Sequence, residues 1–298
     1  MPEETTTHDN PPVLPMPLQL WSGINFSTWP DLKWSRANTH VAAMQSKICE
    51  WHASAPVSIE GVLRDDHQGI DLVVRIPRGI PKHEWALDLG DALHNFRSAF
   101  DAMAWGMAHF DGAEPSRPKA VAFPICLNDG QWKDAAKAWI SKIRPEFQER
   151  LRLLQPFTFA PGEVTVMSML HELDIQDKHH DSLTVKAEVH ALNVEATFEY
   201  QDPSSKLPPR VEMYEDVKFS DGAVLGTIHA GGEIRMVGDF FLQPDIKVQL
   251  EYKNGVQDVL PMLQQFSEET RRCLDILKHG LAPADESASG EWLPLNIG

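Results

Sequence analysis

The segment from Glu84 to Phe110 constrains the fold of this chain more than any other. It is long enough for about seven turns of α-helix, and at about 100° per residue its side chains divide into two stripes on opposite sides of the helix. The apolar stripe consists of Leu89, Leu93, Phe96, Phe100, Met103 and Met107. The polar stripe consists of Asp91, His94, Asn95, Ser98 and Asp101, with Arg97 at its edge. The apolar stripe predicts a helix that lies on a core.

The composition of the polar stripe is unusual for a protein surface. A helix with one face on a core normally carries Lys and Glu on its other face. This stripe has neither, and it consists of residues that bind ligands, exchange protons or form buried hydrogen bonds. It therefore indicates either a functional site or a buried polar network that locks one helix to another.

A second polar cluster lies in the sequence LHELDIQDKHHD, which starts at Leu170. With helical spacing, one face carries three polar residues and the C-terminal end carries two more: His171, Asp174 and Lys178, then His179 and His180. Basic residues also suit a helix C-terminus for purely electrostatic reasons, because the helix dipole attracts them. If this helix lay beside the first one, the two clusters would meet in one crevice.

The remaining patterns predict an α+β protein. The first and last helices both have heptad-like apolar spacing, so we expect them to pack together. Alternating apolar and polar residues predict a hairpin early in the chain and a sheet later. We expect a disordered tail over 1–17, a mainly helical core over 18–181 with a β-hairpin at 57–76, an antiparallel β region over 182–255, a C-terminal helix over 256–280 that packs on the core, and a tail over 281–298. The fold class is thus a helical bundle core with an N-terminal β-hairpin and a C-terminal antiparallel sheet, closed by a C-terminal helix.

Charge and composition limit the function. The chain has 27 basic and 43 acidic residues, a net charge of −16, which disfavours a long track along a nucleic-acid backbone because each phosphate contact needs a local cation. A small, locally basic pocket remains compatible with this charge. Three separated cysteines, Cys49, Cys126 and Cys273, predict neither a disulfide framework nor a cysteine zinc site. We find no secretory signal and no run of roughly 18 apolar residues, and we expect a cytoplasmic protein with no membrane partner.

The segment GDALHNFRSAFD at Gly90, with LHELD and DKH downstream, resembles a widespread group of uncharacterised bacterial proteins that is common in actinobacteria. Those proteins carry a Gly-Asp-x-x-His-Asn-Leu-Arg-Ser-x-Leu-Asp-His-x-x-Trp helix and a later Asp-Lys-His-Arg segment. The resemblance covers roughly Asp31 to His180. The resemblance implies which group of proteins the chain is related to, but it implies no particular reaction.

The same group is distantly similar to HEPN-type helical ribonucleases. In their motif, Arg is followed by four residues and His; the Arg steadies the phosphate and the His assists attack by the RNA 2′-hydroxyl. Arg97 and Asp101 match the group's Arg-Ser-x-Leu-Asp-His, but Ala102 stands at the histidine position. Another histidine would then have to supply the base, from His94, His171 and His179. Such proteins often dimerise to complete their site, so the resemblance also implies a homodimer.

The leading hypothesis is a polar inter-helix site for a phosphate-containing ligand, nucleotide or RNA. In it, Arg97 with Lys178 binds the anion, His94 or His171 is the acid or base, and an aspartate orients that histidine. The candidate catalytic residues are His94, Arg97, Asp101 and His171. The candidate ligand-binding residues are Asp91, Asn95, Ser98, Asp174, Lys178 and His179.

Two alternatives remain open. In the first, the protein is a non-catalytic binding or scaffold protein: the polar stripe is structural, with Asp91 and Asp101 paired to Arg97, and the β-rich part presents the surface for a protein partner. In the second, it is a metal-dependent hydrolase, although no HExxH spacing is present. The candidate zinc or manganese ligands are Asp91, His94, His171 and Asp174. The sequence indicates no particular cofactor and leaves open whether the protein is an enzyme.

Overall fold

The α+β class, with its closing C-terminal helix, is confirmed by a computed structural model of the chain. The residues it describes are 28–54, 56–112, 114–159, 164–179, 183–202, 204, 208–215, 217–253 and 255–280. The tails expected at 1–17 and 281–298, and His180, lie outside the described residues. Within those residues, no helix combines the length and the apolar character that a membrane crossing needs.

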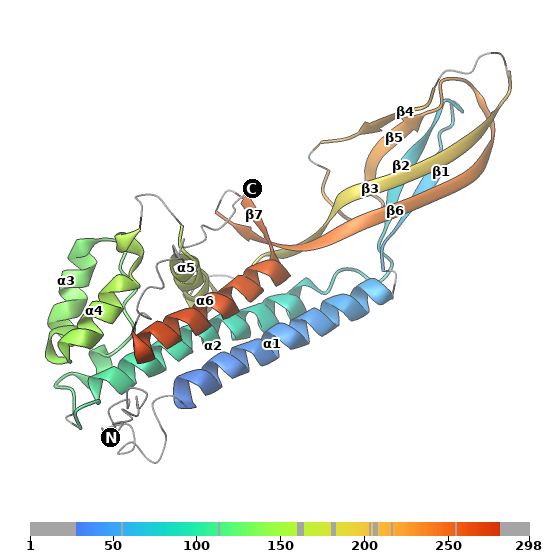
Figure 1. The fold of residues 1–298 in the computed structure, drawn as a ribbon. Coiled ribbons are helices and arrows are strands. Elements are labelled where there is room, and N and C mark those ends of the chain that lie inside the picture. The colour runs from blue at the N-terminus through green and yellow to red at the C-terminus, as the bar shows by residue number, and fades with distance from the viewer. Residues whose placement is uncertain are drawn as a thin grey trace, which may run out of the picture. The chain divides into compact units, whose positions relative to one another are not determined.

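Figure 1 shows the helices of the chain. They are α1 (Thr28–Ala53), α2 (Lys82–Ala108), α3 (Asp129–Ala138), α4 (Pro145–Leu153), α5 (Val166–His179) and α6 (Val259–His279), with short 3-10 turns η2 (Pro118–Ala120), η3 (Ile140–Lys142) and η4 (Pro156–Thr158). Local chemistry fixes their starts. Pro145 occupies the first turn of α4, and the side chain of Asn128 caps α3 by accepting a hydrogen bond from the Gln131 amide.

The strands form two antiparallel sheets. They are β1 (Ser58–Leu63), β2 (Gly69–Arg75), β3 (Val185–Tyr200), β4 (Arg210–Met213), β5 (Val224–His229), β6 (Ile234–Tyr252) and β7 (Gly255–Asp258). One sheet has the order β1-β2-β5-β4 and the other β3-β6-β7. The expected hairpin is therefore joined to later strands, since β2 pairs with β5. The β region that we expected after residue 182 contributes to both sheets.

The chain divides into two compact units. We call Met1–Ala42, Asp88–Leu183 and Pro261–Gly298 the helical unit, and Ala43–Leu87 with Thr184–Leu260 the β-rich unit. In the β-rich unit, Ile70, Ala230 and Ile234 form a buried cluster against which side chains of β3 and β6 pack. Both units are built from segments that are distant in the sequence.

The core of the helical unit contains the apolar stripe of α2, as predicted. Its residues are each at most 1% exposed: Leu89, Leu93, Phe96, Phe100, Met103 and Met107. The ring of Phe100 lies 4.9 Å from that of Phe123, which belongs to the extended segment after η2. Across the same unit, α6 contacts α1: the indole N–H of Trp34 donates to the Ser267 carbonyl at 2.9 Å. The burial of the apolar stripe fixes the direction in which the polar stripe faces.

Candidate functional site

The polar stripe of α2 lies against α5, so the structure brings the two polar clusters of the sequence together. Three neighbouring pairs define the contact: Gly90 with Asp177, His94 with Asp174, and Arg97 with His171. Residue numbers rise along α2 while they fall along α5, so the two helices are antiparallel. Within each cluster the residues are three or four positions apart, so they lie on one face of their helix, and these two faces meet.

Gly90 lets the carboxylate of Asp177 come close to the backbone of α2. A Cβ atom added there would lie 2.6 Å from Oδ2 of Asp177, closer than such atoms come in proteins. Burial raises the pKa of Asp177, and the charges of Asp174 and Asp91 raise it further. Asp177 is a site residue that the sequence patterns did not indicate. The glycine four positions before His94 is the signal that another element comes close there.

His94 lies at the middle of the contact between α2 and α5, and its side chain is accessible to solvent. Its side chain is 50% exposed, and its Nδ1 lies 3.5 Å from Oδ1 of Asp174, whose side chain is only 6% exposed. The other carboxylate oxygen of Asp174 accepts a hydrogen bond from Lys178 Nζ at 2.7 Å. On the opposite side of the ring, Nε2 lies 3.4 Å from the Ser98 hydroxyl. A half-exposed histidine with a carboxylate beside one nitrogen and a hydroxyl beside the other can exchange protons.

Arg97 has different surroundings, because it is only 9% exposed. Its Nη2 donates to the carbonyl of Phe123 at 2.8 Å, and its Nη1 lies 2.9 Å from Oδ1 of Asp101. The second contact is an ion pair without the angle of a hydrogen bond. Asp101 in turn accepts a hydrogen bond from the Phe123 amide at 2.9 Å. Arg97 and Asp101 together hold both backbone groups of one residue, an arrangement that we call the Phe123 clamp.

His171 lies beside the Phe123 clamp, since the charges of both Arg97 and Asp101 act on its imidazole. Burial lowers its pKa, and the charge of Arg97 lowers it further, so the imidazole is neutral at pH 7. Its Nδ1 is enclosed and has no hydrogen-bond partner among the described residues. His179 is the last residue of α5, and its side chain lies outside what the structure describes. Of the three histidines that we considered as the base, the structure therefore describes the surroundings of His94 and His171.

The remaining candidates lie at the exposed side of the stripe. Asp91 has a 65% exposed side chain 3.8 Å from Nδ1 of His40 on α1. Asn95 donates to the Asp91 carbonyl at 2.8 Å, a bond within the helix. Three carboxylates, those of Asp91, Asp174 and Asp177, interact in this half of the interface, and the ammonium of Lys178 is already bonded to one of them. The local charge is negative, which disfavours phosphate.

The geometry gives no support to the metal hypothesis. Of its four proposed ligands, His94 and Asp174 are the two whose side chains are at ion-pair distance from each other, with Nδ1 3.5 Å from Oδ1. Within the part of the chain that the structure describes, no three His, Cys, Asp or Glu side chains are placed to hold a metal ion together.

Comparison with known proteins adds no further constraint, since no family model, curated protein or solved structure matches this chain. The resemblance to the bacterial group and to HEPN domains stays a prediction from the motifs.

Proposed function

We propose that this chain is a non-catalytic binding protein in which the polar stripe of α2 is architectural. The observation that carries the proposal is the Phe123 clamp. The guanidinium of Arg97 is buried and is occupied by a backbone carbonyl and by Asp101, so it is not free to receive a phosphate. The clamp ties the extended segment around Phe123 to the helix that forms the core.

The rest of the stripe fits the same role. Asp174 is buried and compensated by Lys178, and Asp177 fills the space that Gly90 leaves. Contacts of this kind specify how two helices pack, because a displaced helix would leave buried charges without partners. The binding surface for a protein partner, which we expected on the β-rich part, stays a prediction.

The test is the stability of Arg97→Ala, with His94→Ala as the matched control from the same helix. We expect Arg97→Ala to lower the free energy of unfolding by about 2 to 3 kcal/mol, because it leaves a buried carbonyl unpaired and removes a packed side chain. His94→Ala removes a half-exposed group and should cost less than about 1 kcal/mol. Urea denaturation followed by tryptophan fluorescence measures both. Equal, small effects of the two substitutions would contradict the architectural role.

One observation favours a second candidate function, the acid–base site for a phosphate-containing ligand, nucleotide or RNA. His94 is accessible, with Asp174 behind one nitrogen and Ser98 beside the other, which is the arrangement of a general base. The same two variants separate this candidate from the first. If wild-type protein cleaves RNA and His94→Ala is folded but inactive, the stripe has a catalytic role.

A further inference from the structure

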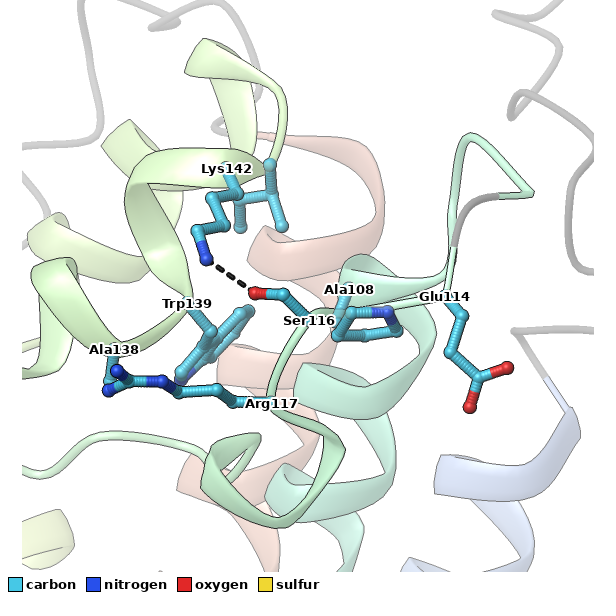
Figure 2. Close-up of a pocket in the computed structure, with 9 residues that line it drawn as sticks. Ala108, Glu114, Ser116, Arg117, Ala138, Trp139 and Lys142 are labelled. Atoms are coloured by element: carbon cyan, nitrogen blue, oxygen red, sulfur yellow. Dashed lines mark hydrogen bonds between the residues drawn. The ribbon is translucent and has the colours of Figure 1, made fainter.

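A groove lies at the C-terminal end of α2, away from the polar stripe but within the helical unit. It has a volume of about 360 Å³ and is bounded by the end of α2, the loop before η2, the end of α3 and η3. Its lining residues are Ala108, Glu114, Pro115, Ser116, Arg117, Ala138, Trp139, Lys142 and Ile143 (Figure 2). A volume of this size suits a small organic molecule.

Two cationic side chains flank the groove. In Figure 2 the ring of Trp139 lies between Lys142 and Arg117. The Lys142 ammonium donates to the Ser116 hydroxyl at 2.5 Å, a neutral partner that leaves its charge uncompensated. Within the described residues, neither cation has a carboxylate at ion-pair distance. The one acidic residue of the lining, Glu114, points away from both in the same view.

Neighbouring cations in the same unit are compensated. Lys133 of α3 pairs with Asp129 at 2.7 Å, and Arg144 at the start of α4 pairs with Asp111 at 2.6 Å. In a chain with a net charge of −16, two cations beside one groove without carboxylate partners create a local positive potential. Such a potential attracts anions despite the overall charge.

The donors in the groove match one anion particularly well. A guanidinium offers a planar pair of N–H donors, an ammonium offers a compact charge, and a hydroxyl offers one more donor. A phosphate monoester presents three terminal oxygens and close to two negative charges at neutral pH. The other lining side chains are mostly small or apolar, among them Ala108, Pro115 and Ala138, and they suit the organic part of an ester better than they suit a free ion.

We infer that this groove binds a small phosphate monoester, with Arg117, Lys142 and Ser116 around the phosphate and the apolar lining against the organic part. The site goes beyond the proposed function, which concerns the stripe of α2, and it would give the binding protein its ligand class. Its phosphate chemistry is the same for a sugar phosphate and for a nucleoside monophosphate, so the experiment must distinguish them.

The test is calorimetric titration of the full-length chain with ribose 5-phosphate, AMP, adenosine and inorganic phosphate. We expect at least one ester to bind with a dissociation constant below about 1 mM, and adenosine not to bind. Preference for AMP or for ribose 5-phosphate identifies the organic part. Binding of neither ester, binding of inorganic phosphate alone, or equal binding of AMP and adenosine would overturn the inference.

Variants locate the site. Arg117→Gln and Lys142→Gln should each weaken ester binding about tenfold or more, because each removes a charged donor. Lys119→Gln is the matched control, since Lys119 is an exposed cation two residues from Arg117 that does not line the groove. Both groove residues are exposed, and melting curves of the single variants verify that they fold. Undiminished binding by both variants would also overturn the assignment. Because these variants leave Arg97 in place, failure here is distinct from failure of the architectural role.

Discussion

Arg97 and His94 are three residues apart on the same helix, yet their burial gives them different roles. Arg97 is 9% exposed and bonded to backbone, whereas the side chain of His94 is 50% exposed and lies beside a carboxylate. Residue type alone made both of them candidates for catalysis. Burial distinguishes a charge that holds the fold together from a group that can meet a ligand.

Asp177 gives a pH prediction at the same scale. Its pKa is raised in the folded state above the ordinary value of 3.8, so its ionisation disfavours folding. The stability that its neutral form contributes is complete below pH 3.8 and is lost as the pH rises through the folded-state pKa. Asp177→Asn should therefore be more stable than wild type at pH 7, and the difference should vanish near pH 3. Thermal melting across this range measures it; a constant difference at all pH values would refute this explanation.

The sequence identified the residues of the interface better than it identified their partners. Helical spacing placed His94, Arg97 and Asp101 on one face, and the structure confirms that the apolar face opposite them is buried. The partner of Arg97, however, is the backbone carbonyl of Phe123. A backbone group has no signature in the pattern of side chains, so the Phe123 clamp could not be predicted. The groove cations were missed because their uncompensated state depends on the folded neighbourhood.

At the scale of elements, spacing explains why α2 and α5 fit each other. Positions 90, 94 and 97 of α2 meet positions 177, 174 and 171 of α5, since residues three and four apart lie on one face of a helix. Local periodicity also predicted the hairpin of β1 and β2. It could not predict that β2 pairs with β5, about 150 residues later, because strand pairing is set by tertiary contacts.

The pairing of the first and last helices gives a prediction at this scale. Lys278 of α6 is 3% exposed, and its ammonium bonds to both carboxylate oxygens of Asp31 on α1, at 2.6 and 2.7 Å. Asp31→Ala should lower the free energy of unfolding by at least about 2 kcal/mol, because it removes the carboxylate partner of a buried charge. Lys133→Ala breaks an exposed pair and should cost less than about 1 kcal/mol. Urea denaturation compares them, and similar costs would show that α1 and α6 do not depend on this contact.

For the whole molecule, the division into two units does not follow the order of the chain. The sequence suggested a helical part that includes the hairpin, followed by a β part, whereas the compact units each combine distant segments.

The net charge of the whole molecule does not determine which ligands a single site can bind. The value of −16 disfavours extended contact with nucleic acid, but the potential at one groove depends on the charges beside it. A single phosphate can therefore bind to a strongly acidic protein.

The central claim is that the polar stripe holds the fold through the Phe123 clamp, and amide hydrogen exchange at Phe123 tests it most directly. The Phe123 amide donates to Asp101, so wild-type protein should exchange it as slowly as the amides inside α2. In Asp101→Ala this amide should exchange orders of magnitude faster, while the amide of Leu151 in α4 keeps its wild-type rate. Fast exchange in wild type, or the same slow exchange in the variant, would contradict the account.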